Sequence, residues 1–470
     1  MQIDSNPLLI WFVIGYGVLM ILIGLYYSKK IDNNDDFILA GKTLGPVVLM
    51  GTLLATWVGS GAVTGGQNSI AYSFGIWPAI GYALPSLIGI LTILVIGSKI
   101  RNYGKYTIAE ILEMKFGKVA GYFAAIIIIL SFIGIVSYQY KGLGFVLHVS
   151  TGISVETGTI IAAVIIIFLA TIGGLMSVAP TDAFSAFLVI IALAIALPLG
   201  IHVAGGWNHI IDSTPKKMLK PMGSLSAIQI LGYYIPTLFL LLGDQNIYQR
   251  ISASKSDKSS RWGTIGWIIG LLIVTPLISL LAFISRAIFP KIEPGMALIA
   301  LSSQLPIFVG GLLIAALTAF IVTTGNSYLL SAATSVIYDI FNHIFKKAES
   351  DKMLLYTRIL VPVLGVIAFL LTTFFPTILS VQMYAYTVYG AGITPALLAV
   401  FLYPKVTKVA GLTSMALGLV STLIWEFFFV QSTGINSAII SVPLAILAII
   451  IITPLTYKEK DNDELKATTN

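Results

Sequence analysis

The segment GTLLATWVGSGAVTGGQNSIAY, from Gly51 to Tyr72, combines a long apolar run with residues that break helices. Its glycines cluster at positions 59, 61, 65 and 66, with small hydroxyl and amide residues around them. Such residues weaken a membrane helix and release backbone carbonyls that lipid cannot satisfy. We therefore expect a helix interrupted near the bilayer midplane, where secondary transporters hold ions and solute. The alternative is that the small residues only permit close helix packing.

Composition places the chain in a membrane. Of the 470 residues, 57% are hydrophobic and only 10% are charged, with a mean hydropathy of +0.95, which excludes an ordinary soluble protein. The absence of cysteine excludes disulfides and thiolate metal sites. The formal charge of +7 could indicate nucleic-acid binding, but in a membrane protein it more often marks cytoplasmic loops. We expect an all-α polytopic membrane protein with no nucleic-acid partner.

Apolar segments long enough to cross a bilayer, at roughly 20 residues each, number about 13. They lie at 7–27, 44–73, 76–98, 119–147, 155–175, 178–204, 226–248, 263–287, 307–336, 357–375, 378–402, 410–430 and 437–456. Lys and Arg are concentrated in alternate loops, so the positive-inside rule places the N-terminus outside and the C-terminus in the cytoplasm. This predicts a multi-pass protein of the cell membrane, in a bacterium the inner membrane. The first apolar run lacks a signal-peptide cleavage site, so we expect it to be retained.

The order of the interrupted segments indicates an internal repeat. Helix 44–73 opens one group of five spans, and helix 226–248, with the breakers Gly232, Pro236 and Gly243, opens the next five. An odd number of spans per group inverts the second copy, as in many transporters. The alternative is coincidence, because Gly and Pro are frequent in membrane helices. The expected organisation is an extra helix and cytoplasmic loop at 1–43, repeats at 44–205 and 226–403 separated by an extracellular loop at 206–225, two additional helices at 404–456 and a cytoplasmic tail at 457–470.

A series of motifs between Asp36 and Gly411 resembles the sodium:solute symporter family. The motifs are DFILAGKTLG at 36–45, ATWVGSG at 55–61, GKYTIAEILEMKFG at 104–117, SYQYKGLGFVLHVSTGIS at 137–154, GGLMSVAPTDAF at 173–184, GDQNIYQRISASKSDKSSR at 243–261, AALTAFIVTTGNSYLLSAATSVIYDIF at 315–341 and YGAGITPALLAVFLYPKVTKVAG at 389–411. The ATWVGSG motif is nearest to the family's choline branch. The resemblance implies the inverted-repeat fold of the bacterial leucine transporter. It also implies import of a small organic solute by alternating access, with Na+ as the coupling ion.

Thr323 and Thr324 form a hydroxyl pair on the apolar segment 307–336. A hard monovalent cation prefers oxygen ligands, which two hydroxyls and the carbonyls of a broken helix can provide. Similarity to the family maps its common sodium site onto these two hydroxyls and backbone oxygens. The backbone oxygens are those of Ala55, Val58 and Phe320. The alternative is that both hydroxyls bond to their own helix.

Asp182 begins an apolar run after a Gly-Gly pair, and an acid at membrane depth usually has an ionic partner. The family has an acid at this position that is implicated in cation coupling. With Ser327, one turn beyond the threonine pair, it forms a candidate second cation site. The alternative is a carboxylate that caps its helix or pairs with a loop lysine. The number of sodium ions therefore stays open.

Lys141 lies inside the predicted span 119–147, where an unpaired ammonium would cost about 3 kcal/mol on insertion scales. Three partners are considered: a solute carboxylate, an ion pair with Asp182 or Asp244, or the membrane interface, reached by snorkelling. In related sialic acid transporters a cationic side chain on the corresponding helix binds the solute carboxylate. The first alternative favours an anionic cargo such as a monocarboxylate, an amino acid or a sialic-acid-like compound.

Further solute-facing positions are expected from the fold. They are Thr56, Trp57, Ser60 and Thr64 at the break, Gln139 on helix 119–147, Tyr234 and Asp244 on helix 226–248, and Thr387 and Tyr389 on helix 378–402. Leu240 replaces the aromatic inner gate of the sugar branch, which argues against a sugar. Choline is the alternative cargo, because Trp57 matches a residue of the aromatic cage in the choline branch. Lys141 would repel that cation.

Signatures of an enzyme are missing from the sequence. The histidines, His148, His202, His209 and His343, show no metal-ligand spacing, and no phosphate-binding loop is present. Sodium is therefore the only metal ion expected. The chain is expected to be a carrier that works as a monomer, with a passive channel as the alternative from another functional class.

Overall fold

The computed structural model describes residues 5–28, 34–103, 105, 107–172, 175–341, 350–375 and 377–457. Its main helices are α1 (Leu9–Ser28), α3 (Pro46–Ser60), α4 (Gly66–Phe74), α5 (Ile76–Gly81), α6 (Ala83–Tyr103), α7 (Ile108–Phe116), α8 (Lys118–Thr151), α9 (Val155–Ile172), α10 (Leu175–Val203), α11 (Trp207–Asp212), α12 (Ala227–Gly243), α13 (Gln245–Ser252), α14 (Asp257–Ile288), α15 (Ala297–Ser302), α16 (Ile307–Ser335), α18 (Ser350–Leu371), α19 (Ile378–Gly392), α20 (Thr394–Leu402), α21 (Lys408–Phe428), α22 (Val430–Thr433) and α23 (Ala438–Thr456). These residues form no β-strand. Residues 458–470 of the expected tail and His343 lie outside the described residues.

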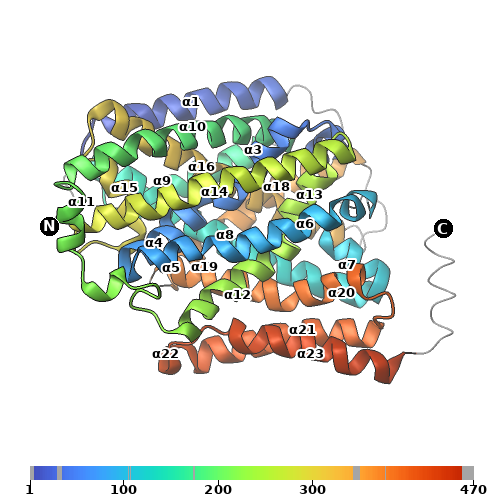
Figure 1. The fold of residues 1–470 in the computed structure, drawn as a ribbon. Helices are drawn as coiled ribbons and strands as arrows, with labels where there is room; N and C mark the ends of the chain where they lie inside the picture. Colours follow the sequence, from blue (N-terminus) through green and yellow to red (C-terminus); the bar gives the residue numbers. More distant parts are fainter. Residues whose placement is uncertain are drawn as a thin grey trace.

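The long helices run along a common direction (Figure 1). Helix α1 lies on one side of the bundle, and the pair α21 and α23 forms a layer on the opposite side. Short helices mark the two ends: α11 lies at one end and α7 at the other. These ends are called the α11 end and the α7 end below.

Eleven helices within the described residues are long and apolar enough to cross a membrane. Two shorter apolar helices, Val155–Thr171 and Leu355–Leu371, occupy the remaining segments expected from the sequence. The expected fold class, an all-α polytopic membrane protein, is confirmed. The count of thirteen full-length spans is not, because the apolar stretches of these two helices within the described residues are shorter than the eleven spans.

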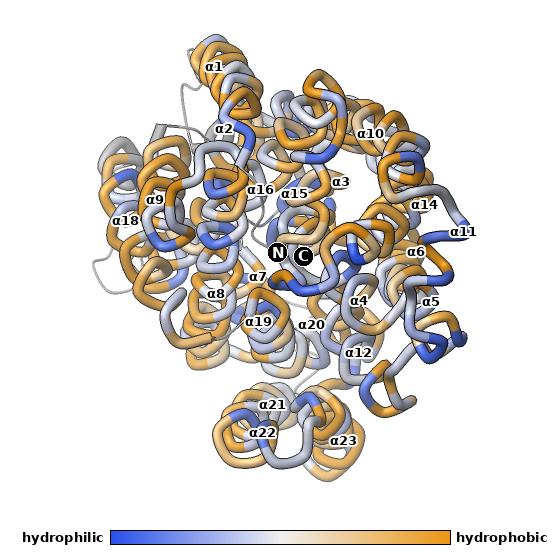
Figure 2. Tube along the Cα trace, turned by 90° about the vertical axis from the view of Figure 1, so that its left-hand side faces the viewer, coloured by the Kyte–Doolittle hydropathy of each residue, from blue (hydrophilic) through white to orange (hydrophobic). Residues whose placement is uncertain are grey.

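Burial separates peripheral from central helices. In the most apolar stretch of α1 only 17% of the residues are buried, whereas the share is 83% in the span Pro46–Phe74. It is also high in the spans containing α16 and α19. The outer helices consist largely of apolar residues (Figure 2), and many of their large apolar side chains are exposed. This is the pattern of a protein that faces lipid and keeps its polar groups inside.

The first interruption lies where the glycine cluster predicts it. Gly59 has φ +29° and ψ −161°, a conformation that side chains disfavour, and it ends the regular part of α3. A π-helical turn from Gly61 to Gly65 follows, and α4 starts at Gly66. The two halves of this span, α3 and α4, are therefore separate helices joined by buried irregular backbone.

The second interruption lies at Asp244, between α12 and α13. Its backbone is extended, with φ −61° and ψ 115°, and its carboxylate accepts the Asn246 N–H at 2.8 Å as an N-cap. Of the expected breakers only Gly243 adjoins the interruption. Gly232 and Pro236 lie within α12, which continues through both.

Candidate ion and solute site

The hydroxyl pair of α16 faces the interrupted helix. Thr324 Oγ1 donates to the Ala55 carbonyl at 3.2 Å, and Thr323 Oγ1 lies 3.4 Å from the Phe320 carbonyl. Gly59 lies directly against Thr324, so that a side chain at this glycine would overlap the threonine hydroxyl. The break and the hydroxyl pair are thus in contact.

The two hydrogen-bonding contacts just described contain four of the five expected sodium ligands, namely Thr323, Thr324, Ala55 and Phe320. The fifth, the Val58 carbonyl, accepts the N–H of Gly61 across the turn. Thr323 and Thr324 are 4% and 3% exposed, so the oxygens are shielded from solvent. A buried group of hydroxyl and carbonyl oxygens suits a desolvated small cation.

Asp182 is fully buried and pairs with Arg250 of α13 at 3.2 Å. Its Oδ2 also accepts the Thr52 hydroxyl at 2.6 Å, and Thr52 in turn accepts the Arg250 Nε–H at 2.9 Å. Arg250 donates a further hydrogen bond to Ser327 at 2.8 Å. The guanidinium therefore joins α13 to α3, α10 and α16 at one point.

Arg250 is the charged residue that the sequence analysis missed. The expected partner of Asp182 was a loop lysine or a sodium ion, whereas the structure provides a buried arginine seven residues after Gly243. The signal was a basic residue close behind a predicted break. Asp182 Oδ1 is buried and has no hydrogen-bond partner, so one carboxylate oxygen is left for a further cation or water.

Lys141 pairs with Glu293, with 3.3 Å between Nζ and Oε1, and its ammonium lies 5.9 Å from the centre of the Phe145 ring. Its ionic partner is therefore neither Asp182 nor Asp244. Asp244 instead accepts a hydrogen bond from the Tyr328 hydroxyl. Glu293 lies in the loop after α14, and sequence spacing gives no indication of this pairing because the two residues are far apart in the chain.

The expected solute positions on the break are buried against α6, α8 and α19. Trp57 donates its indole N–H to Ser86 at 3.0 Å and stacks on Tyr386, with 6.3 Å between ring centres. Ser60 and Thr64 hydrogen-bond to each other. Thr56 Oγ1 and both amide atoms of Gln139 on α8 are buried without a hydrogen-bond partner. Buried polar groups of this kind normally bind water or a ligand.

Other expected solute positions make contacts that stabilise the fold. Tyr389 donates to the Gly243 carbonyl at 2.7 Å and accepts the Gln245 N–H at 3.2 Å, so it supports the second interruption together with Asp244. Thr387 donates to the Met383 carbonyl of its own helix at 2.9 Å. The Tyr234 ring packs edge-on against Tyr82. The contacts of Tyr389, Thr387 and Tyr234 described here involve no residue between Gly59 and Gly66.

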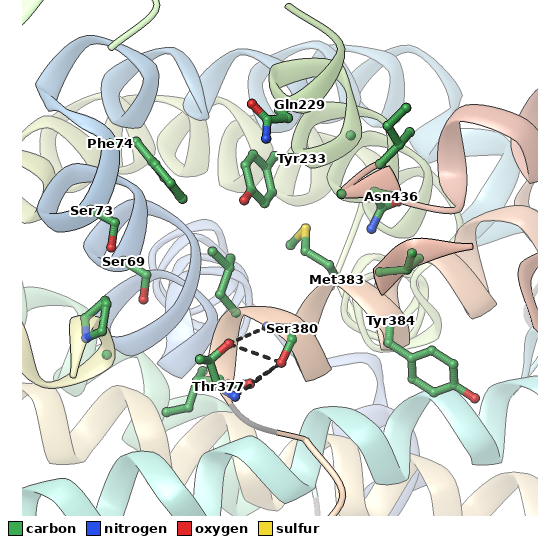
Figure 3. Close-up of a pocket in the computed structure, with 18 of the residues that line it drawn as sticks. Ser69, Ser73, Phe74, Gln229, Tyr233, Thr377, Ser380, Met383, Tyr384 and Asn436 are labelled. Carbon is green, nitrogen blue, oxygen red and sulfur yellow. Dashed lines mark hydrogen bonds between the residues drawn. The ribbon is translucent and has the colours of Figure 1, made fainter. Parts of the chain in front are cut away.

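A cavity of about 370 Å³ lies at the α11 end, between α4, α12, α19 and the loop before α23. Ser69, Phe74, Gln229, Tyr233, Met383 and Asn436 are among its lining residues, and their side chains surround the open space (Figure 3). Ser69 lies one turn beyond the start of α4. The cavity therefore approaches the first break from the α11 end.

A model of the sodium:solute symporter family matches residues 37–418. The chain belongs to this family. Among similar symporters, the high-affinity proline transporter PutP of Bacillus subtilis is 27% identical over 455 residues, covering 90% of this chain and 94% of the relative. The sodium/pantothenate symporter of Escherichia coli is 24% identical over 482 residues, covering 95% of each.

Solved structures give the same fold. A substrate-bound, outward-open Na+-coupled sialic acid symporter superposes with a TM-score of 0.81 at 17% identity, covering 96% of this chain and 98% of the other. The nucleobase-cation-symport-1 family transporter Mhp1 superposes with a TM-score of 0.64 at 13% identity, covering 93% and 99%. At these identities the likeness concerns the fold alone.

Family membership confirms the main functional expectations. The protein is a multi-pass membrane transporter, not an enzyme, and it couples movement of a small organic solute to Na+. The coupling ion is a transported partner and not a fixed cofactor.

Proposed function

We propose that this symporter imports a small solute bearing a carboxylate, such as a monocarboxylate, an amino acid or a sialic-acid-like compound. The observation that carries the proposal is the contact between Thr324 and Ala55, which joins a hydroxyl pair to the carbonyls of a broken helix. Sodium bound there holds α3 against α16, and the membrane potential supplies roughly 2.3 kcal/mol per charge per 100 mV. Sodium is thereby coupled to the position of the break.

The carboxylate preference has two supports. The relatives are named as proline and pantothenate transporters, and both compounds carry a carboxylate. Lys141 lines a small cavity with Ser137 and Tyr138, and its partner Glu293 is partly solvent-exposed. A solute carboxylate would compete with Glu293 for the ammonium, so in this proposal Lys141 exchanges one anion for another.

Choline is the second candidate cargo, because Trp57 and Tyr386 form two stacked aromatic faces beside the break. Such faces attract quaternary amines. The named relatives give choline no support over a carboxylate solute. The aromatic pair also suits the apolar part of an amino acid, and the carboxylate proposal therefore ranks first.

A second sodium ion is proposed at Asp182 and Ser327. Its support is the free oxygen Asp182 Oδ1, on a carboxylate whose other oxygen already contacts Thr52 and Arg250. The proposed orientation has the N-terminus outside and the C-terminus in the cytoplasm of a bacterial inner membrane, so that the α11 end faces outward. We propose that the monomer is sufficient for transport.

Uptake into proteoliposomes tests these proposals. Labelled L-proline, pantothenate, sialic acid and choline are compared under an inward sodium gradient, with potassium replacing sodium as the control. Accumulation of a carboxylate solute only in sodium supports the proposal, whereas accumulation of choline alone would overturn it. Counterflow of the same solute at equal sodium distinguishes a carrier from a passive channel.

A further inference from the structure

Gln382 of α19 lies against the first break and is only 1% exposed. Its Oε1 accepts the backbone N–H of Gly66 at 2.9 Å. Gly66 is the first residue of α4, and its N–H also donates to the Gly61 carbonyl across the π-helical turn. The Gln382 carboxamide is thus a second acceptor for this N–H, provided by another element of the fold.

The backbone of the break is shaped around this side chain. A methyl group at Gly65 would overlap Gln382 Oε1, and one at Gly61 would lie 3.1 Å from Nε2. At both positions any residue larger than glycine would push the carboxamide away. The glycines of the π-helical turn therefore serve close approach of α19 as well as backbone bending.

Two tyrosine hydroxyls lie beside Gln382 at Gly61. A methyl group at Gly61 would lie 2.7 Å from the hydroxyl of Tyr386, one turn further along α19, and 3.4 Å from the hydroxyl of Tyr138 on α8. The ring of Tyr386 stacks on Trp57 of α3. One face of α19 therefore contacts α3 through a ring and α4 through an amide, whereas Thr324 binds the same break from α16.

We propose that Gln382 is a positioning residue of the solute site, which holds α4 on α19 and so fixes the shape of the break. The inference rests on the proposed function only in assigning solute to that break. Gln382 acts by placing Thr56, Trp57, Ser60 and Thr64, and it contacts neither sodium nor solute. Its loss releases α4 toward the cavity at the α11 end.

The cysteine-free sequence permits a direct test. Ser69→Cys places a thiol on α4 at a position that lines the cavity and is 3% exposed, so maleimide labels it fast only when α4 moves. In proteoliposomes containing potassium and no solute, Gln382→Leu is expected to speed labelling about tenfold, the factor for a lost buried hydrogen bond. Gln382→Glu retains an acceptor for Gly66 and is expected to label at the parent rate.

The adjacent residue provides a matched control. Met383→Leu conserves volume in the same cavity wall and should leave labelling unchanged. Equal labelling of the Gln382→Leu and parent proteins would overturn the proposal, as would equally fast labelling of the leucine and glutamate variants. Gly65→Ala places a methyl group on Gln382 Oε1 and displaces the carboxamide, so it should also speed labelling even if Gln382→Leu fails to fold. Parent-like labelling of Gly65→Ala would contradict the proposal.

Transport provides a second readout. For the solute that the uptake panel identifies, Gln382→Leu should raise the half-saturation concentration, whereas the sodium-induced shift in Tm, measured without solute, should be unchanged. Loss of the sodium shift as well would show that the residue supports the whole fold. Because the labelling assay uses no solute, a failed carboxylate assignment leaves its result valid.

Discussion

At the residue scale, the Thr324 hydroxyl is the group whose role can be tested most cleanly. Thr324→Ala removes the contact with the Ala55 carbonyl and one proposed sodium ligand. We expect the sodium half-saturation concentration to rise at least about tenfold, the effect of losing an ion-bound hydroxyl worth about 1.4 kcal/mol or more. Sodium-dependent uptake measures it. Thr318→Ala is the control, because Thr318 bonds only to the Ile314 carbonyl of its own helix. Unchanged sodium dependence in Thr324→Ala would refute the site.

Arg250 and Asp182 form a buried ion pair in which neither charge tolerates the loss of the other. Removing one partner of such a pair typically costs about 3–5 kcal/mol, because the remaining charge is left in a medium of low polarity. We therefore expect Arg250→Gln to lower the Tm strongly. Adding Asp182→Asn to that variant should recover part of the loss, as measured by thermal unfolding in detergent. A double variant that is no more stable than Arg250→Gln would argue against charge pairing as the cause.

Substitution of Lys141 distinguishes a structural role of its ammonium from a role in binding the solute. Its pair with Glu293 is partly exposed, whereas the Arg250–Asp182 pair is fully buried, so Lys141→Gln should lower the Tm much less than Arg250→Gln does. If the ammonium receives the solute carboxylate, the same variant should lose most carboxylate uptake. Glu293→Gln is the matched control, since it breaks the pair but keeps the ammonium. Normal uptake by Lys141→Gln would show that the lysine only binds Glu293.

At the element scale, α3 and α13, the halves of the two interrupted spans that lie toward the α7 end, are joined to each other. Leu44, just before α3, donates to the Ala253 carbonyl at 3.1 Å and accepts the Lys255 N–H at 2.9 Å, in the segment after α13. Arg250 adds its bond to Thr52. With two independent connections, α3 and α13 are expected to move as one body during alternating access.

A disulfide tests this shared motion. Leu44→Cys and Ser254→Cys occupy bridged positions, so the two thiols are close enough to oxidise. Because the link joins parts that move together, oxidation should leave sodium-coupled uptake intact. Each single-cysteine variant, treated in the same way, is the control. Inhibition that a reductant reverses would show that α3 and α13 separate during transport.

The elements also show which features the sequence could predict. The first break follows from local chemistry, since four glycines lie close together between Gly59 and Gly66, whereas the single Gly232 leaves α12 unbroken. The second break occurs beside Gly243 and not at Pro236, because α12 keeps its course through the proline. The partners Arg250 and Glu293 could not be predicted, because each pairing joins segments distant in the chain. The contact between Gln382 and Gly66 could not be predicted for the same reason.

At the scale of the whole molecule, the proposed sodium and solute sites lie on different sides of one break. The proposed ion site uses α16, whereas the proposed solute site and its clamp use α8 and α19. In this proposal either ligand stabilises the same arrangement of α3 and α4. The peripheral α1, α21 and α23 lie outside this centre (Figure 1).

If sodium and solute both bind at the same break, each ligand must change the affinity of the protein for the other. If sodium increases solute affinity by a given factor, the solute must increase sodium affinity by the same factor, because both describe one thermodynamic cycle. Calorimetric titration of each ligand, with and without the other, measures the two factors. We expect both to exceed unity and to agree, and both to fall toward unity in Thr324→Ala. Unequal factors would mean that a further ion binds in one titration, and repeating the experiment in Ser327→Ala, which keeps the Arg250–Asp182 pair, would test whether that ion uses the proposed second site.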